Sequence, residues 1–156
     1  MIVLSRSSEY AIRALTYLAS RRAERRFHLA REMAELLGIP APFLGKVLQA
    51  FVKSGLLESQ RGRRGGFRLV REPESIRLAE LVDAQEGFEA QRPCFLGQAE
   101  CSDERACPLH EYWRAAHASF QEQLARTTLA ELVDFCEERP GSGYPFPAAS
   151  LSRSDP

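Results

Sequence analysis

The stretch LGIPAPFLGKVLQAFVKSGLLESQRGRRGGFRLV, residues 37–70, decides the fold. After Pro42, which the first turn of a helix accepts, apolar residues recur at helical spacing until Gly55 stops the pattern. The period then changes to two short strand-like segments, 56–59 and 67–70, which the glycine-rich RGRRGG joins as a hairpin tip. A phosphate-binding loop would have to open a helix, whereas a strand-like segment follows here. The stretch therefore predicts a helix followed by a β wing.

Two further helices precede this stretch. The first spans 5–22, with Ser5 as its N-cap, and the second carries an apolar stripe from Leu29 to Leu37 that Gly38 ends. Three helices with the turn LGIPA between the last two have the outline of a helix-turn-helix. The fold class is therefore mainly α with a small β wing, and residues 1–75 form a winged helix-turn-helix domain.

The charge is divided unevenly along the chain. Residues 1–75 hold 14 Arg or Lys against 7 Asp or Glu, and residues 76–156 hold 7 against 14. Only the first half suits a polyanion such as double-stranded DNA. The alternative is a plain helical bundle whose arginines form a solvated face. The candidate DNA contacts lie on the second helix of the motif and on the wing: Pro42, Lys46, Gln49, Arg61, Arg63 and Arg64.

The second half predicts a linker segment, 76–92, with a helix over 78–86, and then a long helix from about 108 to 126. Thr128 and Glu131 match a capping box for a final helix. We expect the helices within 108–139 to form a dimer interface and the tail 140–156, rich in Pro, Ser and Gly, to be mobile. His28 and His117 are expected on helix surfaces or turns.

Three cysteines and a histidine gather in the loop 93–110. Cys94, Cys101, Cys107 and His110 are spaced C-x6-C-x5-C-x2-H. Thiolates with one nitrogen or oxygen donor can complete an iron–sulphur cluster or a tetrahedral zinc site. The gaps are longer than zinc sites usually have and suit a loop around a larger group. A partial disulphide set and unligated thiols are the alternatives, while Cys136 on an apolar helical face is expected to be a buried structural thiol.

Four stretches, taken in order, give the chain a family resemblance from Leu4 to about Glu138. They are SEYAIRALTYLA, RGRRGGFRL in the wing, IRLAELVDAQEG in the linker, and CPLHEYWRAA with TTLAELVD near the end. With these stretches the sequence resembles the Rrf family of winged-helix repressors, which includes IscR-like and NsrR-like members. The resemblance implies a homodimer that binds a palindromic operator and carries an iron–sulphur cluster in each cysteine loop.

Carried over by position, Cys94, Cys101 and Cys107 match the family's cysteine ligands, and Arg61 matches a wing arginine that contacts DNA. The fourth ligand is His110 in the IscR-like pattern or Glu9 of the partner subunit in the NsrR-like pattern. The resemblance favours His110. It also favours a 2Fe-2S over a 4Fe-4S cluster, although the gap from Cys94 to Cys101 is one residue longer than usual.

Other function classes remain open: a regulator that uses zinc or bare thiols, or a cluster carrier or electron-transfer protein without a DNA role. An enzyme is not expected, because no nucleophile elbow, nucleotide loop or acid/base constellation is present. The apolar residues Met1–Leu4 meet Ser and Arg at once, which indicates neither a signal peptide nor a membrane span. A cytoplasmic location follows as the expectation.

Overall fold

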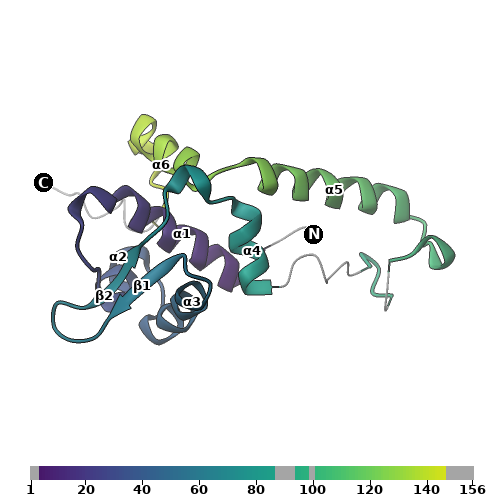
Figure 1. Ribbon diagram of the computed structural model, residues 1–156. Coiled ribbons are helices and arrows are strands. Elements are labelled where there is room, and N and C mark those ends of the chain that lie inside the picture. The colour runs from purple at the N-terminus through teal and green to yellow at the C-terminus, as the bar shows by residue number, and fades with distance from the viewer. Residues whose placement is uncertain (1–3, 87–93, 99–100, 147–156) are drawn as a thin grey trace, which may run out of the picture.

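The computed structural model describes residues 4–86, 94–98 and 101–146. Figure 1 shows a helical body with a short hairpin at one side and a long helix, α5, that extends away from it. The helices are α1 (Arg6–Ser20), α2 (Ala30–Leu37), α3 (Ala41–Lys53), α4 (Leu78–Glu86), α5 (His110–Arg126) and α6 (Leu129–Glu138). The strands are β1 (Leu57–Gln60) and β2 (Gly66–Leu69), and the 3-10 turns are η1 (Arg22–Glu24), η2 (Pro73–Ser75), η3 (Asp103–Arg105) and η4 (Pro140–Ser142).

Local signals set the helix ends as the sequence predicts. The Ser5 hydroxyl accepts a hydrogen bond from the Ser8 amide (3.2 Å) at the start of α1. Thr128 and Glu131 form the predicted capping box at the start of α6. Gly38 takes the left-handed conformation (φ 63°) that ends α2 and turns the chain into α3. The helix-turn-helix of α2 and α3 is thereby confirmed.

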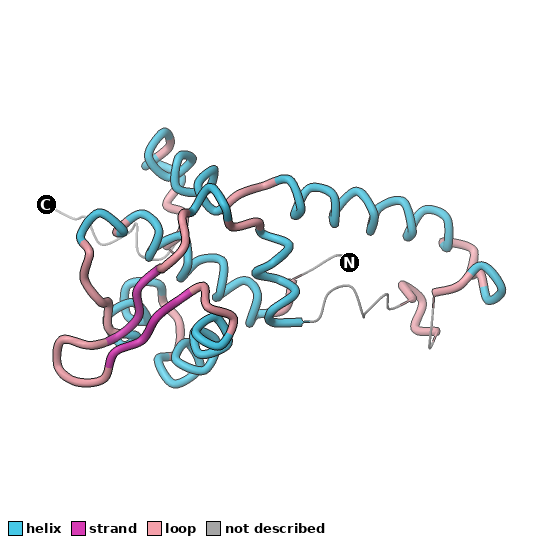
Figure 2. The backbone as a smooth tube through the Cα atoms, viewed as in Figure 1, coloured by secondary structure: helices cyan, strands magenta, loops and turns pink. Residues whose placement is uncertain are grey.

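The wing is a two-stranded antiparallel hairpin, magenta in Figure 2. Leu57 pairs with Leu69 and Gln60 with Gly66, so both strands lie one residue away from their expected positions. His28 pairs with the free edge of β2. Its amide donates to the Phe67 carbonyl, and its carbonyl accepts from the Phe67 amide, both at 2.9 Å. Gly66 permits this approach: at φ 125°, a Cβ there would lie 2.1 Å from the His28 carbonyl oxygen.

The hydrophobic core joins both halves of the chain. Side chains from α1, α2, α3 and α4 fill it, and Leu129 of α6 is fully buried in the same cluster. α6 packs against α1 and η2. Two backbone hydrogen bonds also join the segment before α4 to the segment before α6. Leu78 donates to the Thr127 carbonyl (3.0 Å), and Leu129 donates to the Ile76 carbonyl (2.9 Å). The last helix is therefore part of the body that carries the wing.

Part of the expected mobile tail is packed instead. Residues 140–146 lie against α1, whereas 147–156 fall outside the described residues. Arg13 Nε donates to the Pro145 carbonyl (2.8 Å), and the Tyr144 hydroxyl lies 3.3 Å from the Thr16 hydroxyl. Tyr144 and Pro145 supply apolar surface that a tail of only Ser and Gly would lack, so this segment can cover α1.

Two histidines expected at the surface are buried. His28 is 3% exposed and meets the Tyr17 ring edge-on, with centroids 5.7 Å apart. His117 is 8% exposed and lies 6.1 Å from the Trp113 ring. The prediction was wrong because burial of His28 follows from its pairing with β2, a contact distant in sequence.

No single helix among the described residues is long and apolar enough to cross a membrane. Within the part of the chain that the structure describes, α2 and α3 reach that length and composition as a pair, but they are bent by 116° with their apolar faces in the protein core.

Candidate functional site

The second helix of the motif, α3, divides into a buried and an exposed face. Leu44 and Leu48 are fully buried in the core. Lys46 and Gln49, the candidate readers, and Pro42, the third DNA-contact candidate on this helix, are all exposed on the other side. The Gln85 amide of α4 donates to the Val47 carbonyl (3.2 Å) and so ties α3 to the linker helix. The exposed face has the polar and cationic side chains that contact DNA bases and phosphates.

Three exposed arginines, Arg61, Arg63 and Arg64, lie at the wing tip between β1 and β2, and β1 packs against α3. Among the described residues, no carboxylate lies within ion-pair distance of them. Six other arginines of the basic half form ion pairs, among them Arg68 with Glu58, and Arg71 with Glu80 at 2.5 Å. Three cations for which the described residues supply no counter-ion therefore lie together at the hairpin tip, where phosphates would replace solvent ions.

Cys94 lies in a tight turn that directs backbone amides at its sulphur. It is 7% exposed, and Gly97 closes the turn by donating to the Cys94 carbonyl (2.9 Å) with φ 83°. The amides of Gln98 and Leu96 bond to the thiol and lower its pKa, as does a hydrogen bond from the side chain of Cys107. The turn thus favours a thiolate, which is the form that binds iron or zinc.

Cys101 and His110 make a second contact at the end of α5. The Cys101 Sγ lies 3.3 Å from His110 Nδ1, and His110 itself is only 5% exposed. The His110 amide donates to the Cys107 carbonyl (2.9 Å), which fixes the first turn of the helix against the loop. The described structure thus joins the four predicted loop ligands as two contacting pairs.

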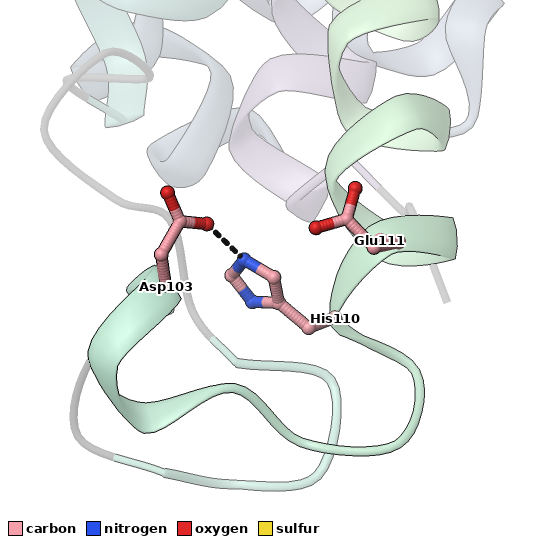
Figure 3. A group of neighbouring side chains, drawn as sticks. All are labelled: Asp103, His110 and Glu111. Carbon is pink, nitrogen blue, oxygen red and sulfur yellow. Dashed lines mark hydrogen bonds and ion pairs between the residues drawn. The ribbon is translucent and has the colours of Figure 1, made fainter.

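Two acidic residues that the sequence did not single out surround His110 (Figure 3). Asp103 Oδ1 lies 2.9 Å from His110 Nε2, and ligand atoms of Asp103, His110 and Glu111 all lie within 4.8 Å of one another. Arg114 contacts both carboxylates, Asp103 at 3.4 Å and Glu111 at 2.8 Å. The hydrogen bond to His110 and the charge of Arg114 lower the pKa of Asp103. The only sequence signal was the position of Asp103 two residues after Cys101.

The remaining candidates lie elsewhere. Glu9 is on α1, where its carboxylate is 3.5 Å from the Arg13 guanidinium. Cys136 is half-buried on α6, and burial raises the pKa of its thiol, as expected for a thiol without a ligand role. The described structure provides no contact between either residue and the cysteine loop.

Several known proteins are similar to this chain. A family model described as Rrf2, iron-dependent transcriptional regulator, matches residues 4–135. The transcriptional regulator NsrR of Shouchella clausii is 31% identical over 131 residues, which cover 83% of this chain and 87% of that protein. The solved structure of T. potens IscR superposes with a TM-score of 0.69 at 26% identity, covering 88% of this chain and 90% of that one.

The fold recurs at lower identity in CymR of B. subtilis, with a TM-score of 0.71 at 23% identity, over 86% of this chain and 98% of that one. The family match spans the winged domain, the linker, the cysteine loop and α5. Its members are transcriptional regulators rather than enzymes, and they bind DNA. This chain therefore belongs to the Rrf2 family of winged helix-turn-helix transcriptional regulators.

Proposed function

We propose that this regulator, acting as a repressor, binds a palindromic operator as a homodimer and that an iron–sulphur cluster held at the cysteine loop controls this binding. The observation that carries the proposal is the pairing of Cys94 with Cys107 and of Cys101 with His110 at one end of α5. Three thiols and one imidazole are the donor set of a cluster with one nitrogen ligand. A 2Fe-2S cluster is the favoured form, as the family resemblance implies.

The residues present fit such a group. Backbone amides already bond to the Cys94 sulphur, as they would to a cluster-bound thiolate, and such bonds tune reduction potential. His110 is buried with one ring nitrogen directed at Cys101 and the other bonded to Asp103. When bound, the cluster would supply one-electron redox chemistry and reactivity toward nitric oxide or oxygen. The protein holds the ligating side chains and transmits a change in cluster state to the DNA-binding helices.

The linker helix α4 gives a route from the loop to the DNA-binding face. At its last residue, the Glu86 carboxylate accepts a hydrogen bond from the Ser5 amide (2.9 Å). Burial alone would raise the pKa of Glu86, but hydrogen bonding at the start of α1 outweighs it and lowers that pKa. The neighbouring Gln85 holds the α3 backbone at Val47. Ligation at the loop would fix the chain leaving α4, and with it the spacing of two recognition helices that must match successive major grooves, about 34 Å apart.

The homodimer is supported by the surface of α5. Figure 1 shows this helix standing away from the body; Tyr112 on it is 74% exposed, and Leu109, its N-cap residue, is 38% exposed. Apolar and aromatic side chains in such positions are typical of interfaces. A second copy of the helix would cover them. The cytoplasm, where DNA and reduced thiols are both found, is the proposed location.

Anaerobic purification followed by iron and sulphide analysis and gel-shift assays tests the proposal. The wild type should carry iron and sulphide in equal amounts, and its operator affinity should change when nitric oxide or oxygen destroys the cluster. Cys101→Ser should lose the cluster and the response, whereas Cys136→Ser, the same change at the remaining cysteine, should keep both.

Each alternative function gives a different result in the same experiment. Stoichiometric zinc without sulphide would indicate a zinc regulator, and a metal-free protein that responds to thiol oxidants would indicate bare thiols. Cluster without salt-dependent DNA binding would indicate a carrier or electron-transfer protein. Any of these three outcomes would refute the proposed mechanism.

A further inference from the structure

We propose that Asp103 is a positioning residue for His110: by accepting a hydrogen bond from Nε2, it holds the imidazole so that Nδ1, unprotonated and facing Cys101, is the nitrogen offered to the cluster. The inference rests on the proposed function, because it assigns a role toward the same site. It adds a residue outside the ligand set that the family resemblance implies.

The geometry defines the two sides of the ring. His110 Nε2 lies 2.9 Å from Asp103 Oδ1, and His110 Nδ1 lies 3.3 Å from Cys101 Sγ (Figure 3 shows the acidic side). An ionised carboxylate can only accept, so Nε2 must carry the proton in this bond. A neutral imidazole has one N–H, and Nδ1 is then left with its lone pair on the thiol side.

The position of Asp103 is itself supported. It is the first residue of the turn η3, and Arg114, one turn along α5 from His110, contacts the same Oδ1 atom at 3.4 Å. The carboxylate thus joins the loop to the helix through two side chains. His110 is buried while the Asp103 side chain is 77% exposed, so the carboxylate can be replaced without opening the protein core.

Carboxylate–histidine–metal arrangements orient the ring and raise the basicity of the ligating nitrogen, and their loss typically costs about 10- to 100-fold in metal affinity. Glu111 is near the same ring but is bonded to Arg114 rather than to His110. Asp103 is therefore the acidic residue near His110 whose removal should release the imidazole.

The first test uses the protein without cluster. With ¹⁵N-labelled histidine, NMR should show a slowly exchanging Nε2–H signal from His110, assigned by its loss in His110→Ala. The signal should persist in Glu104→Gln, a matched removal of a carboxylate from the next residue of η3, and disappear in Asp103→Ala. A wild type without this signal, or an Asp103→Ala variant that keeps it, would overturn the positioning role.

The second test uses the reconstituted protein under anaerobic conditions. Asp103→Ala should release iron to a chelator at least about 10-fold faster than wild type and alter the nitrogen hyperfine coupling of the reduced cluster. Asp103→Asn, whose amide oxygen still accepts from Nε2, should keep the coupling but shift the reduction potential upward, because a negative charge is lost. Glu104→Gln should match wild type in iron release and in nitrogen hyperfine coupling.

Unchanged coupling, potential and iron release in Asp103→Ala, with an unchanged melting temperature, would refute the proposal for the loaded protein. A wild type that takes up no iron and sulphide would instead refute the proposed function. In that case the NMR comparison still decides whether Asp103 positions the ring, so the two failures are distinguishable.

Discussion

Glu9 Oε1 lies 3.5 Å from Arg13 Nη1 on α1, and the same guanidinium donates from Nε to the Pro145 carbonyl at 2.8 Å. The Glu9 carboxylate therefore has a cationic partner held in place by the packed tail. His110, by contrast, directs Nδ1 at a loop cysteine. This difference favours His110 as the fourth cluster ligand.

The corresponding prediction compares two variants. His110→Ala should lower the iron and sulphide retained after anaerobic reconstitution, because an interior nitrogen donor is lost, whereas Glu9→Gln should retain wild-type amounts. His117→Ala, a buried histidine further along α5, is the control for damage to the helix. Loss of the cluster in Glu9→Gln with retention in His110→Ala would instead establish the acidic ligand.

Arg61→Ala should weaken specific operator binding by about 1–3 kcal/mol, measured by gel shift at fixed salt. The reason is the exposure of Arg61 at the wing tip without a carboxylate partner among the described residues. If the neighbouring Arg63 and Arg64 contact phosphates, each alanine variant should reduce the slope of log affinity against log salt by about 0.9. Arg126→Ala, an exposed arginine on α5, should change neither quantity.

Gly66→Ala should destabilise the wing more than Gly62→Ala does. Both glycines have positive φ, so either alanine costs about 1–2 kcal/mol in backbone strain. Only at position 66 would the new Cβ also meet backbone, the His28 carbonyl oxygen at 2.1 Å, while the space around Gly62 is open. Urea denaturation of the two variants measures the difference. Equal midpoints would show that the His28 backbone moves away from the new Cβ without loss of stability.

Stability should fall as the pH is lowered from about 6.5. Burial, followed by the charge of Arg26, lowers the folded-state pKa of His28 from its ordinary value of 6.5, so the unfolded chain binds its proton first. The contribution is complete above 6.5 and is lost as the pH falls toward the folded-state pKa. Hydrogen bonds from Arg26 and Arg21 lower the pKa of Glu24 from 4.5 to about 2, so its contribution to stability is complete above about 4.5 and is lost only as the pH falls from there toward 2.

Urea midpoints at pH 7.5 and 5.5 measure this effect in the wild type and in His28→Gln. The variant should lose the part of the pH dependence that His28 contributes. An unchanged difference between the two pH values would assign the dependence to other groups.

The elements of the fold could be predicted because their signals are local. Ser5, Gly38 and Thr128 act on backbone groups within a few residues, and the helices end within two residues of the expected positions. The pairing of His28 with Phe67 could not be predicted, since neither the period nor a turn residue marks it. The place of α6 in the core was missed for the same reason.

The candidate site was only partly accessible from the sequence. Cysteine spacing indicated which loop would hold ligands, because three thiols in one short segment are typical of a metal or cluster site. The contact of Asp103 with His110 depends on the path of the intervening turn η3, which no spacing rule gives. Likewise, the sequence gives the number of arginines but not which of them already have acidic partners.

The attachment of α5 has a mechanical consequence. The helix is bonded to the body at its Thr127 end, through the Leu78 amide, and carries the cysteine loop at its His110 end. Its 17 residues make a lever about 25 Å long at 1.5 Å per residue. Each degree of rotation at the attached end therefore displaces the loop end by about 0.4 Å. A tilt of a few degrees at the attached end thus moves the loop end by as much as the length of a covalent bond.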